Sequence, residues 1–415
     1  MTTRAEALAL DAADPLAGFR DRFVHGDGAR IYLDGNSLGR LPVATRERLR
    51  AGVDEWGERL VTGWHAWIDA PRRVGDLIGE TLLGVEPGEV LVGDSTTVDL
   101  FKLCGALTAV RDGALVVPLD EFPTDRYVLQ GLAEANGREL RLLESDPVAG
   151  PTAAEVDRAL AGGDVAFVVL SHVNYRSGAL ADLEEITAVG RHHGVPVVWD
   201  LCHSVGVVPL ELGARGAELA VGCTYKYLNA GPGSPAFLYV ARAWQPRLRS
   251  PIQGWFAQED QFAMGHPFAR RDGIEGFLAG TPAILDLAAV EEGVKLTGEA
   301  GLAAIRAKSV ALTELIVELH DERLASLGVS LGSPRDSARR GSHVSLRHPD
   351  AWPICRALIE QADVVPDFRA PDSIRLGVPP LYTRFVDVWD AVDRMCSLVA
   401  RGEHERIGSD RSRVT

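Results

Sequence analysis

Short apolar runs alternate with amphipathic stretches through the middle of the chain. Residues 114–119, 165–170 and 195–201 are rich in valine and leucine, which is typical of strands buried on both faces of a parallel sheet. Between them, residues 124–137 and 180–194 have helical periodicity, and each stretch ends in the glycine that is favoured just past a helix C-terminus. The alternation predicts a doubly wound α/β fold with a mostly parallel sheet of about seven strands between helices.

The pattern changes after residue 285. One long helical pattern over residues 285–324 is followed by shorter strand patterns around residues 343–348 and 373–378. This order predicts a second, smaller α+β domain packed on the first. We therefore expect three parts: an N-terminal segment that joins the small domain (1–50), a large domain that contains the parallel sheet (51–285) and a small C-terminal domain (286–415).

Composition and charge exclude several classes of protein. A hydrophobic fraction of 46% and a charged fraction of 24% among 415 residues are ordinary for a globular protein. The formal net charge of -15 argues against a nucleic-acid or anionic-membrane partner, because such surfaces are bound through accumulated positive charge. No uncharged run approaches the roughly 20 residues that a membrane span needs.

The five cysteines and the N-terminus bear on the cellular compartment. The cysteines are odd in number and lack the spacing of metal ligands, so we expect no metal site and a reducing environment. Asp11 and Asp14 interrupt the N-terminal region, which has no long apolar core and does not resemble a signal peptide. A cytoplasmic location is the expectation.

Two polar features lie where a parallel sheet binds its ligands, beyond the carboxyl ends of strands. Asp200 closes the strand pattern 195–201; it either caps the following turn or pairs with a ring nitrogen of a cofactor. Residues 94–97 (Asp-Ser-Thr-Thr) open a helical pattern, where hydroxyls and free N–H groups suit an anion such as a phosphate. Simple N-capping explains one of these hydroxyls but not all three.

Lys226 is the third feature. Only 4 of the 43 basic residues are lysines, and this one stands between Tyr225 and Tyr227. Neighbours of this kind withdraw a lysine from water and favour the nucleophilic amine that forms Schiff bases, although a surface lysine beside two core tyrosines is also possible. A phosphate site, a carboxylate and an activated lysine at the edge of one sheet together indicate pyridoxal 5'-phosphate (PLP).

Six segments resemble kynureninase, a PLP-dependent hydrolase of fold type I. The segments lie in the family's order and span most of the chain. The stretches YKYLNAGPG and DGNSLG separate this family from aminotransferases and cysteine desulfurases. The matching segments cover residues 32–42, 120–127, 171–178, 199–206, 222–240 and 374–385.

The resemblance implies roles for individual residues. Lys226 would carry the Schiff base, with Asp200 and Tyr225 as the other catalytic residues, and Phe122 would stack on the cofactor ring. Arg375 would grip the substrate α-carboxylate, and Ser37 and Trp64 would also contact the substrate. The residues expected to bind the cofactor are Thr96, Thr97, Phe122, Asp125, Ser171, Asp200, His203, Tyr225, Lys226, Trp255 and Thr281.

The resemblance also implies an assembly and a reaction. Trp255 and Thr281 would reach across a homodimer into the partner's site, so the active sites would be shared. The reaction would be the hydrolytic cleavage of the Cβ–Cγ bond of L-kynurenine to anthranilate and L-alanine, as in tryptophan catabolism. Trp64 would line an apolar wall that leaves a 3-hydroxyl group unpaired, at a cost of roughly 1–3 kcal/mol, so unsubstituted kynurenine would be preferred.

Other functions are also compatible with the sequence. The first is a related hydrolase that acts on 3-hydroxykynurenine or another ring-substituted kynurenine in natural-product biosynthesis, and the segment 264–281, shorter and more basic than the family's loop, is where such a change would enter. The second is desulfuration, which needs a mobile catalytic cysteine that no loop here supplies. The third is a PLP-fold protein kept for binding without turnover, against which the presence of Lys226, Asp200 and Arg375 argues.

Overall fold

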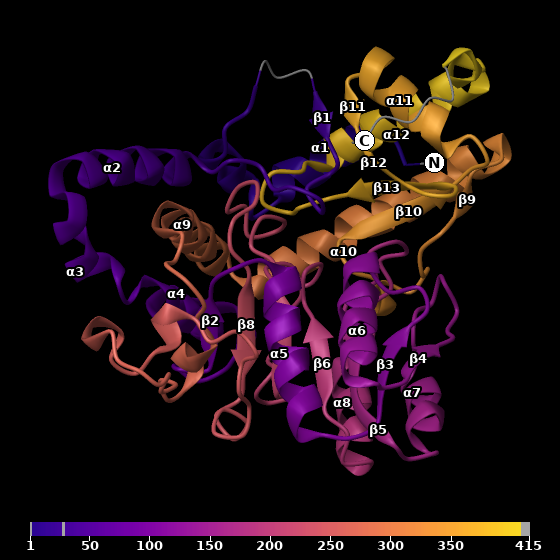
Figure 1. Ribbon diagram of the computed structural model, residues 1–415. Coiled ribbons are helices and arrows are strands. Elements are labelled where there is room, and N and C mark those ends of the chain that lie inside the picture. Colours follow the sequence, from indigo (N-terminus) through magenta and orange to yellow (C-terminus); the bar gives the residue numbers. More distant parts are fainter. Residues whose placement is uncertain (1, 27–29, 408–415) are drawn as a thin grey trace.

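A seven-stranded sheet forms the centre of the molecule in the computed structural model, which describes residues 2–26 and 30–407 (Figure 1). The strand order is β2-β8-β7-β6-β5-β3-β4; β8 is antiparallel to both of its neighbours, and the other pairs are parallel. The predicted mostly parallel sheet is therefore confirmed. Its strands are β2 (Val90–Val92), β3 (Ala114–Pro118), β4 (Leu140–Leu143), β5 (Val165–Ser171), β6 (Val197–Asp200), β7 (Leu219–Gly222) and β8 (Phe237–Val240).

Helices cover both faces of this sheet. Alternate residues of β5 belong to different apolar clusters: Val168 and Leu170 face one layer of helices, and Phe167 and Val169 face the other. This two-sided burial explains why the strands are continuous apolar runs in the sequence. One layer contains α5 (Thr96–Val110) and α6 (Pro123–Asn136); the other contains α4 (Ala70–Ile78), α7 (Ala153–Leu160), α8 (Leu183–His192) and α9 (Ile284–Ala300).

A smaller sheet lies beside the large one, with strand order β12-β13-β10-β9 and only antiparallel pairs. A separate two-stranded parallel pair joins β1, from the N-terminal segment, to β11. The strands are β1 (Ile31–Tyr32), β9 (Ser330–Leu331), β10 (His343–Arg347), β11 (Val364–Val365), β12 (Asp367–Arg369) and β13 (Ser373–Gly377). The helices around them are α1 (Arg4–Ala13), α10 (Leu302–Leu319), α11 (Ala351–Gln361) and α12 (Phe385–Ala400).

The single long helix expected over residues 285–324 is wrong. The chain forms α9, breaks at Gly301, continues as α10 and ends in a π-helical turn at His320–Leu324. Gly301 has a φ of 78°, a left-handed conformation that glycine adopts without a Cβ clash. The break lets α9 pack on the large sheet while α10 packs beside the small one.

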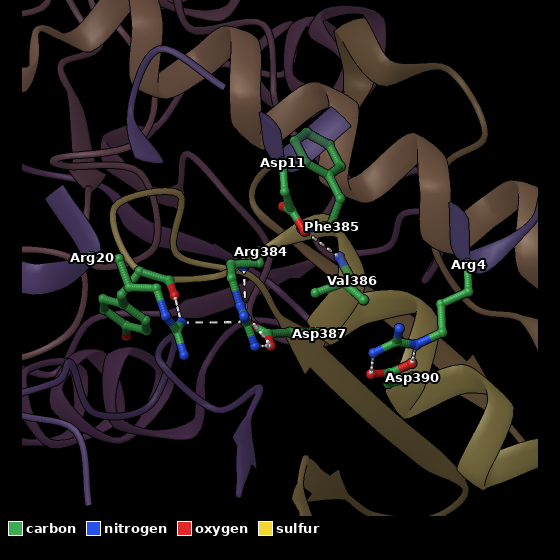
Figure 2. A network of polar contacts seen from close by, with 9 residues as sticks. Arg4, Asp11, Arg20, Arg384, Phe385, Val386, Asp387 and Asp390 are labelled. Carbon is green, nitrogen blue, oxygen red and sulfur yellow. Dashed lines mark hydrogen bonds and ion pairs between the residues drawn. The ribbon is translucent and has the colours of Figure 1, made fainter. Parts of the chain in front are cut away.

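The N-terminal segment is tied to α12 by polar contacts (Figure 2). The carboxylate of Asp11 accepts hydrogen bonds from the backbone N–H groups of Phe385 (2.7 Å) and Val386 (3.0 Å), at the start of α12. Arg4 pairs with Asp390 one turn further along, at 2.7 Å. A carboxylate at a helix N-terminus satisfies free N–H groups and the helix dipole, so Asp11 fixes α1 on α12.

The division of the chain into the parts 1–50, 51–285 and 286–415 stays a prediction. Residues 1, 27–29 and 408–415 of these parts lie outside the described residues. Leu287 and Val294 of α9 lie in an apolar cluster of the large sheet, whereas Leu33 of the N-terminal segment lies in that of the small sheet. None of the described helices is long and apolar enough to cross a membrane. The remaining long element of the N-terminal half is α2 (Val43–Arg59), followed by α3 (Trp64–Trp67).

Candidate active site

Neighbouring strands of the large sheet bring predicted site residues together at their carboxyl ends. Ser171 ends β5, and it lies in register with Asp200, which ends β6. Asp200 is in register with Val221 of β7, and the loop after β7 carries Tyr225 and Lys226. The parallel arrangement places these residues at one edge of the sheet, where open α/β folds bind ligands.

Lys226 lies in a half-buried position with polar and aromatic neighbours. Its Nζ lies 3.0 Å from Nε2 of His203. The ring centres of Phe122 and Tyr225 are further away, at 5.9 Å and 5.8 Å from Nζ. Burial, followed by the charge of Lys226, holds the pKa of His203 well below its usual range. A neutral His203 can therefore accept a hydrogen bond from the Lys226 amine at Nε2.

Asp200 is buried among other acidic groups. Its Oδ1 accepts a hydrogen bond from the backbone N–H of Cys202 at 2.6 Å. The carboxyl of Asp125 is hydrogen-bonded to Asp200, and burial together with the charges of Asp200 and Glu121 raises the pKa of Asp125 well above its usual range. Burial therefore favours the protonated form of Asp125, while the buried carboxylate of Asp200 suits a cationic partner.

Glu121 is a site residue that the sequence analysis missed. It is buried, and its carboxyl accepts hydrogen bonds from the backbone N–H of Ser171 (2.8 Å), the Ser171 hydroxyl (2.5 Å) and the backbone N–H of Phe122 (2.8 Å). Glu121 thus fixes two of the predicted cofactor-binding residues. Its place directly before Phe122, in the segment 120–127 that carried the resemblance, was the available signal.

The predicted anion site opens α5. Ser95 caps the helix by accepting a hydrogen bond from the backbone N–H of Val98 at 3.4 Å, and Thr96 and Thr97 are the first helical residues. The hydroxyl of Thr96 lies 3.8 Å from Sγ of Cys202, which links the helix to the strand end beside Asp200. Free N–H groups and exposed hydroxyls are thus available at the positive end of the helix dipole.

Thr281 lies beside this helix start. A cavity of about 170 Å³ is lined by Thr281, by Gly93 and Asp94 before α5, and by Gly233 of the motif that follows Lys226. The amine of buried Lys102 bonds both Asp94 (2.9 Å) and the carbonyl of Phe277 (2.9 Å). The segment that carries Thr281 is therefore fastened to α5.

Arg375 lies on β13 of the small sheet and is fully buried. Its guanidinium donates hydrogen bonds to the carbonyl of Tyr175, to the carboxylate of Asp367 and, at 3.0 Å, to the hydroxyl of Ser37. The structure thus joins Arg375 and Ser37, two of the three predicted substrate contacts, which come from opposite ends of the chain. Asp367 is a further partner that the sequence analysis missed.

The two most specific motifs touch one another. The backbone N–H of Gly39, in DGNSLG, donates a hydrogen bond of 2.8 Å to the carbonyl of Tyr225, in YKYLNAGPG. A Cβ at Gly39 would stand 2.3 Å from the carbonyl oxygen of Lys226, which explains the glycine. This contact places the segment carrying Ser37 beside the loop that carries Lys226.

Trp64 and Trp255 form a separate group. Their rings pack on Phe256, at 5.9 Å and 5.1 Å between ring centres, and no contact of either with Lys226 occurs among the described residues. Trp64 also lines an apolar groove of about 280 Å³ with Trp56 and Pro282, the neighbour of Thr281. In Figure 1 this region, α2 and α3 with the 255–282 segment, lies at the β2 side of the large sheet.

Comparison with known proteins gives the family. The chain is 42% identical over 412 residues to kynureninase of Pseudomonas fluorescens, an alignment that covers 97% of this chain and 96% of the relative. The chain belongs to the kynureninase family. It is also 42% identical to the kynureninase of Burkholderia pseudomallei (strain 1106a), over 95% of both chains, and residues 305–395 match the kynureninase C-terminal domain. The resemblance stated from the sequence is confirmed.

Solved structures support the same fold. The cystine C–S lyase C-DES, in complex with cysteine persulfide, superposes with a TM-score of 0.79 at 20% identity, covering 90% of this chain and 98% of that chain. A cysteine desulfurase from Thermococcus onnurineus NA1 gives a TM-score of 0.76 at 20% identity, covering 90% and 95%. The fold type I architecture of PLP-dependent enzymes, expected from the sequence, is confirmed.

The residues present fit PLP, the cofactor of the kynureninase family. The buried carboxylate of Asp200 suits a protonated pyridine nitrogen, and the capped start of α5 suits a phosphate. The half-buried amine of Lys226 suits a bond to the cofactor's aldehyde, and the ring of Phe122, 37% exposed and 5.9 Å from that amine, suits stacking on the cofactor ring. No cluster of three metal-ligating side chains occurs among residues 2–26 and 30–407.

Proposed function

We propose that the chain hydrolyses the Cβ–Cγ bond of L-kynurenine and releases anthranilate and L-alanine. The observation that carries the proposal is the joining of two anchors: the Gly39–Tyr225 hydrogen bond brings Ser37, a partner of Arg375, beside the loop of Lys226. An arginine that binds an α-carboxylate and a lysine that bonds an aldehyde must stand near each other in a PLP enzyme that acts on amino acids.

The cofactor would be held by residues from the edge of the large sheet. When bound, PLP supplies an electron sink that stabilises negative charge at the substrate's α-carbon. Lys226 would bond the aldehyde, Asp200 would pair with the ring nitrogen, and Phe122 would stack on the ring. The further contacts are proposed for Thr96, Thr97, Asp125, Ser171, His203 and Tyr225, with Tyr225 directed to the phosphate.

The remaining steps use side chains of this chain. Arg375, with Ser37, would hold the substrate α-carboxylate and so orient the bond to be broken. The Lys226 amine would take the proton from the α-carbon and return it, and neutral His203 at 3.0 Å would accept a hydrogen bond that keeps Nζ in place. Water would add to the γ-ketone before the Cβ–Cγ bond breaks.

The test is a direct assay of the loaded enzyme. Anthranilate fluorescence should rise on addition of L-kynurenine, and kcat/KM for 3-hydroxykynurenine should be lower, as the apolar Trp64 would leave its hydroxyl unpaired. Lys226→Ala should remove both turnover and the near-visible absorbance band of bound PLP. A clear preference for a ring-substituted kynurenine would instead support the hydrolase of natural-product biosynthesis.

We further propose a homodimer with shared active sites. Supporting it, large apolar side chains are exposed near the Trp64 and Trp255 group, including Trp56, Val61, Phe262 and Met264. An apolar surface of this kind is normally covered by a partner, and a second copy would place Trp255 and Thr281 at the other subunit's site.

The five cysteines are all unpaired and buried, which supports a cytoplasmic location, and the net charge of -15 argues against nucleic acid as a partner.

A further inference from the structure

A second arginine stands beside Arg375. Asp367 and Arg369 are two residues apart on β12, so their side chains point to the same face, and Asp367 lies in register with Arg375 on β13. Oδ2 of Asp367 is paired with Nη2 of Arg375 and lies 3.1 Å from Nη2 of Arg369. One carboxylate therefore holds two guanidinium groups.

The hydroxyl of Ser37 lies between the same two arginines. Its Oγ accepts a hydrogen bond from Arg375 at 3.0 Å and lies 3.5 Å from Nη2 of Arg369. The predicted substrate contact Ser37 is thus common to both guanidinium groups. While the nearby Asp34 is protonated, two arginines against the carboxylate of Asp367 leave one surplus positive charge, which suits an anionic ligand with a single carboxylate.

Burial distinguishes the two arginines. Arg375 is fully buried and already donates to Tyr175, Ser37 and Asp367, whereas 35% of the Arg369 side chain is exposed. The Nε–H groups of both arginines are buried and have no hydrogen-bond partner among the described residues. Unpaired buried donors on a positively charged pair are the groups that a bound carboxylate would satisfy.

The charge of Arg369 also acts on His203, the neighbour of Lys226. Burial and the charge of Lys226 lower the pKa of His203 most, and the charges of Arg375 and Arg369 add to this shift; Nε2 of His203 lies 3.0 Å from the Lys226 amine. The partly exposed guanidinium of Arg369 is therefore within electrostatic range of His203, the residue that contacts Lys226.

We propose that Arg369 is a second substrate-binding residue, which binds the α-carboxylate together with Arg375, while Asp367 and Ser37 position the two guanidinium groups. Arg369 provides the accessible charge, and Arg375 provides the rigid one. The inference rests on the proposed function, since it presumes an α-amino acid substrate bound at Arg375. It adds that selection for a free α-carboxylate depends on Arg369.

The experiment compares L-kynurenine with its α-carboxamide on the PLP-loaded enzyme. In Arg369→Gln, the ratio of kcat/KM for the acid to kcat/KM for the amide should fall by at least roughly tenfold. The kcat for the acid should change by less than about threefold, because Arg369 would bind the carboxylate equally in the ground state and in the transition state. Arg369→Lys keeps the positive charge but not the planar guanidinium that bonds a carboxylate through two N–H groups, so its acid-to-amide ratio should be intermediate. Cofactor affinity and melting temperature should stay close to those of the wild type.

Arg347→Gln is the matched control. Arg347 lies on β10 of the same sheet, its side chain is 44% exposed, and it pairs with Asp372 at 2.8 Å. The variant therefore loses a similar ion pair at a position away from Ser37. Its acid-to-amide ratio should equal that of the wild type. If Arg369→Gln lowered kcat/KM for acid and amide equally, or changed neither, Arg369 would be a structural residue and the proposal would be wrong.

A second measurement separates this proposal from the proposed reaction. Titration of the bound cofactor's absorbance with L-alanine and L-alaninamide needs no turnover and reports the same preference for a carboxylate. If the wild type did not hydrolyse kynurenine, the proposed function would fail, and this titration would still decide the role of Arg369. If Arg369→Gln did not fold, Arg369→Lys would be compared with the wild type instead. An unchanged acid-to-amide ratio in Arg369→Lys would then contradict the proposal.

Discussion

The amine of Lys226 and Nε2 of His203 lie 3.0 Å apart at the carboxyl edge of the large sheet. Burial and the charge of Lys226 hold the pKa of His203 well below its usual range, so the imidazole is neutral near neutral pH. The contact is therefore a hydrogen bond from an amine to a neutral ring nitrogen, and His203 acts here by holding Lys226 in place.

The first prediction concerns the pH profile of His203→Gln. Loss of one hydrogen bond to the lysine should lower kcat/KM by roughly tenfold, corresponding to about 1.5 kcal/mol. Because burial lowers the pKa of His203 well below its usual range, the imidazole stays uncharged at neutral and alkaline pH, and the variant's profile should have the same shape there as the wild type's. If the wild type's kcat/KM changed with pH in that range and the change were absent in His203→Gln, His203 would titrate during turnover and the prediction would be wrong.

The second prediction concerns Asp34, in the segment that also carries Ser37. Burial, followed by the charge of Asp367, raises the pKa of Asp34 to about 7, and the charges of Arg375 and Arg369 oppose this shift. Asp34 is thus neutral below this value and negative above it, where it cancels the surplus positive charge of the two arginines. KM for L-kynurenine should therefore rise between about pH 6 and 8, by roughly tenfold if the charges are on the order of 10 Å apart.

Asp34→Asn tests this directly. The variant keeps the shape of the side chain but cannot ionise, so its KM should be nearly independent of pH over that range and close to the low-pH value of the wild type. Steady-state kinetics at constant ionic strength provide the measurement. If Asp34→Asn and the wild type had parallel profiles, another group would cause the pH dependence.

The sequence predicted those strands whose burial on both faces requires a continuous run of apolar residues. The strands β3, β5 and β6 are buried on both faces, so each is a run of apolar residues that needs no knowledge of its partner. The break at Gly301 was not predicted, because apolar periodicity continues on both sides while the packing partner changes from one sheet to the other. Periodicity reports that a face is buried, but it does not say against what.

The candidate site was predictable where residue identity alone carries the chemistry. Lys226 stood out because lysine is rare in this chain, and Asp200 because it closes an apolar strand. Glu121 and Arg369 were missed, because charged residues are common on surfaces and only the folded chain shows Glu121 against Ser171 and Arg369 against Asp367. Their roles depend on strand register and on contacts between distant segments, which periodicity does not contain.

The third prediction concerns Lys102, a buried lysine at the start of the cofactor site. Its amine bonds Asp99 (2.6 Å), Asp94 (2.9 Å) and the carbonyl of Phe277 (2.9 Å). Lys102→Met should lower the stability of the apoprotein by about 3–5 kcal/mol, because a buried carboxylate loses its partner. PLP affinity should also fall, since Asp94 precedes the start of α5 and Phe277 precedes the segment of Thr281. Urea unfolding and titration with PLP measure the two effects.

Lys295→Met is the control for this prediction. Lys295 also bonds two carboxylates, those of Glu291 (2.9 Å) and Glu292 (3.1 Å), but its side chain is 51% exposed. Its replacement should cost less than about 1 kcal/mol and leave PLP affinity unchanged. Equal urea midpoints for the two variants would mean that the Lys102 network does not stabilise the chain.

The fourth prediction concerns the proposed dimer. Trp56 on α2 and Val61 just after it are 59% and 76% exposed, and Trp56 lines the groove shared with Trp64. A double variant, Trp56→Asp with Val61→Asp, would bury two unpaired charges at an interface and should convert the dimer to a monomer in sedimentation velocity. PLP affinity should fall with it, because Trp255 and Thr281 would no longer reach the partner's site.

Leu142→Asp provides the comparison for the dimer variant. Leu142 is 45% exposed on β4, the opposite edge of the sheet from β2, so its replacement adds a charge to an exposed apolar position away from the groove. This variant should remain a dimer with wild-type PLP affinity. A double variant that stayed dimeric would exclude the groove as the interface, and a monomer with undiminished PLP affinity would show that each site is complete within one chain.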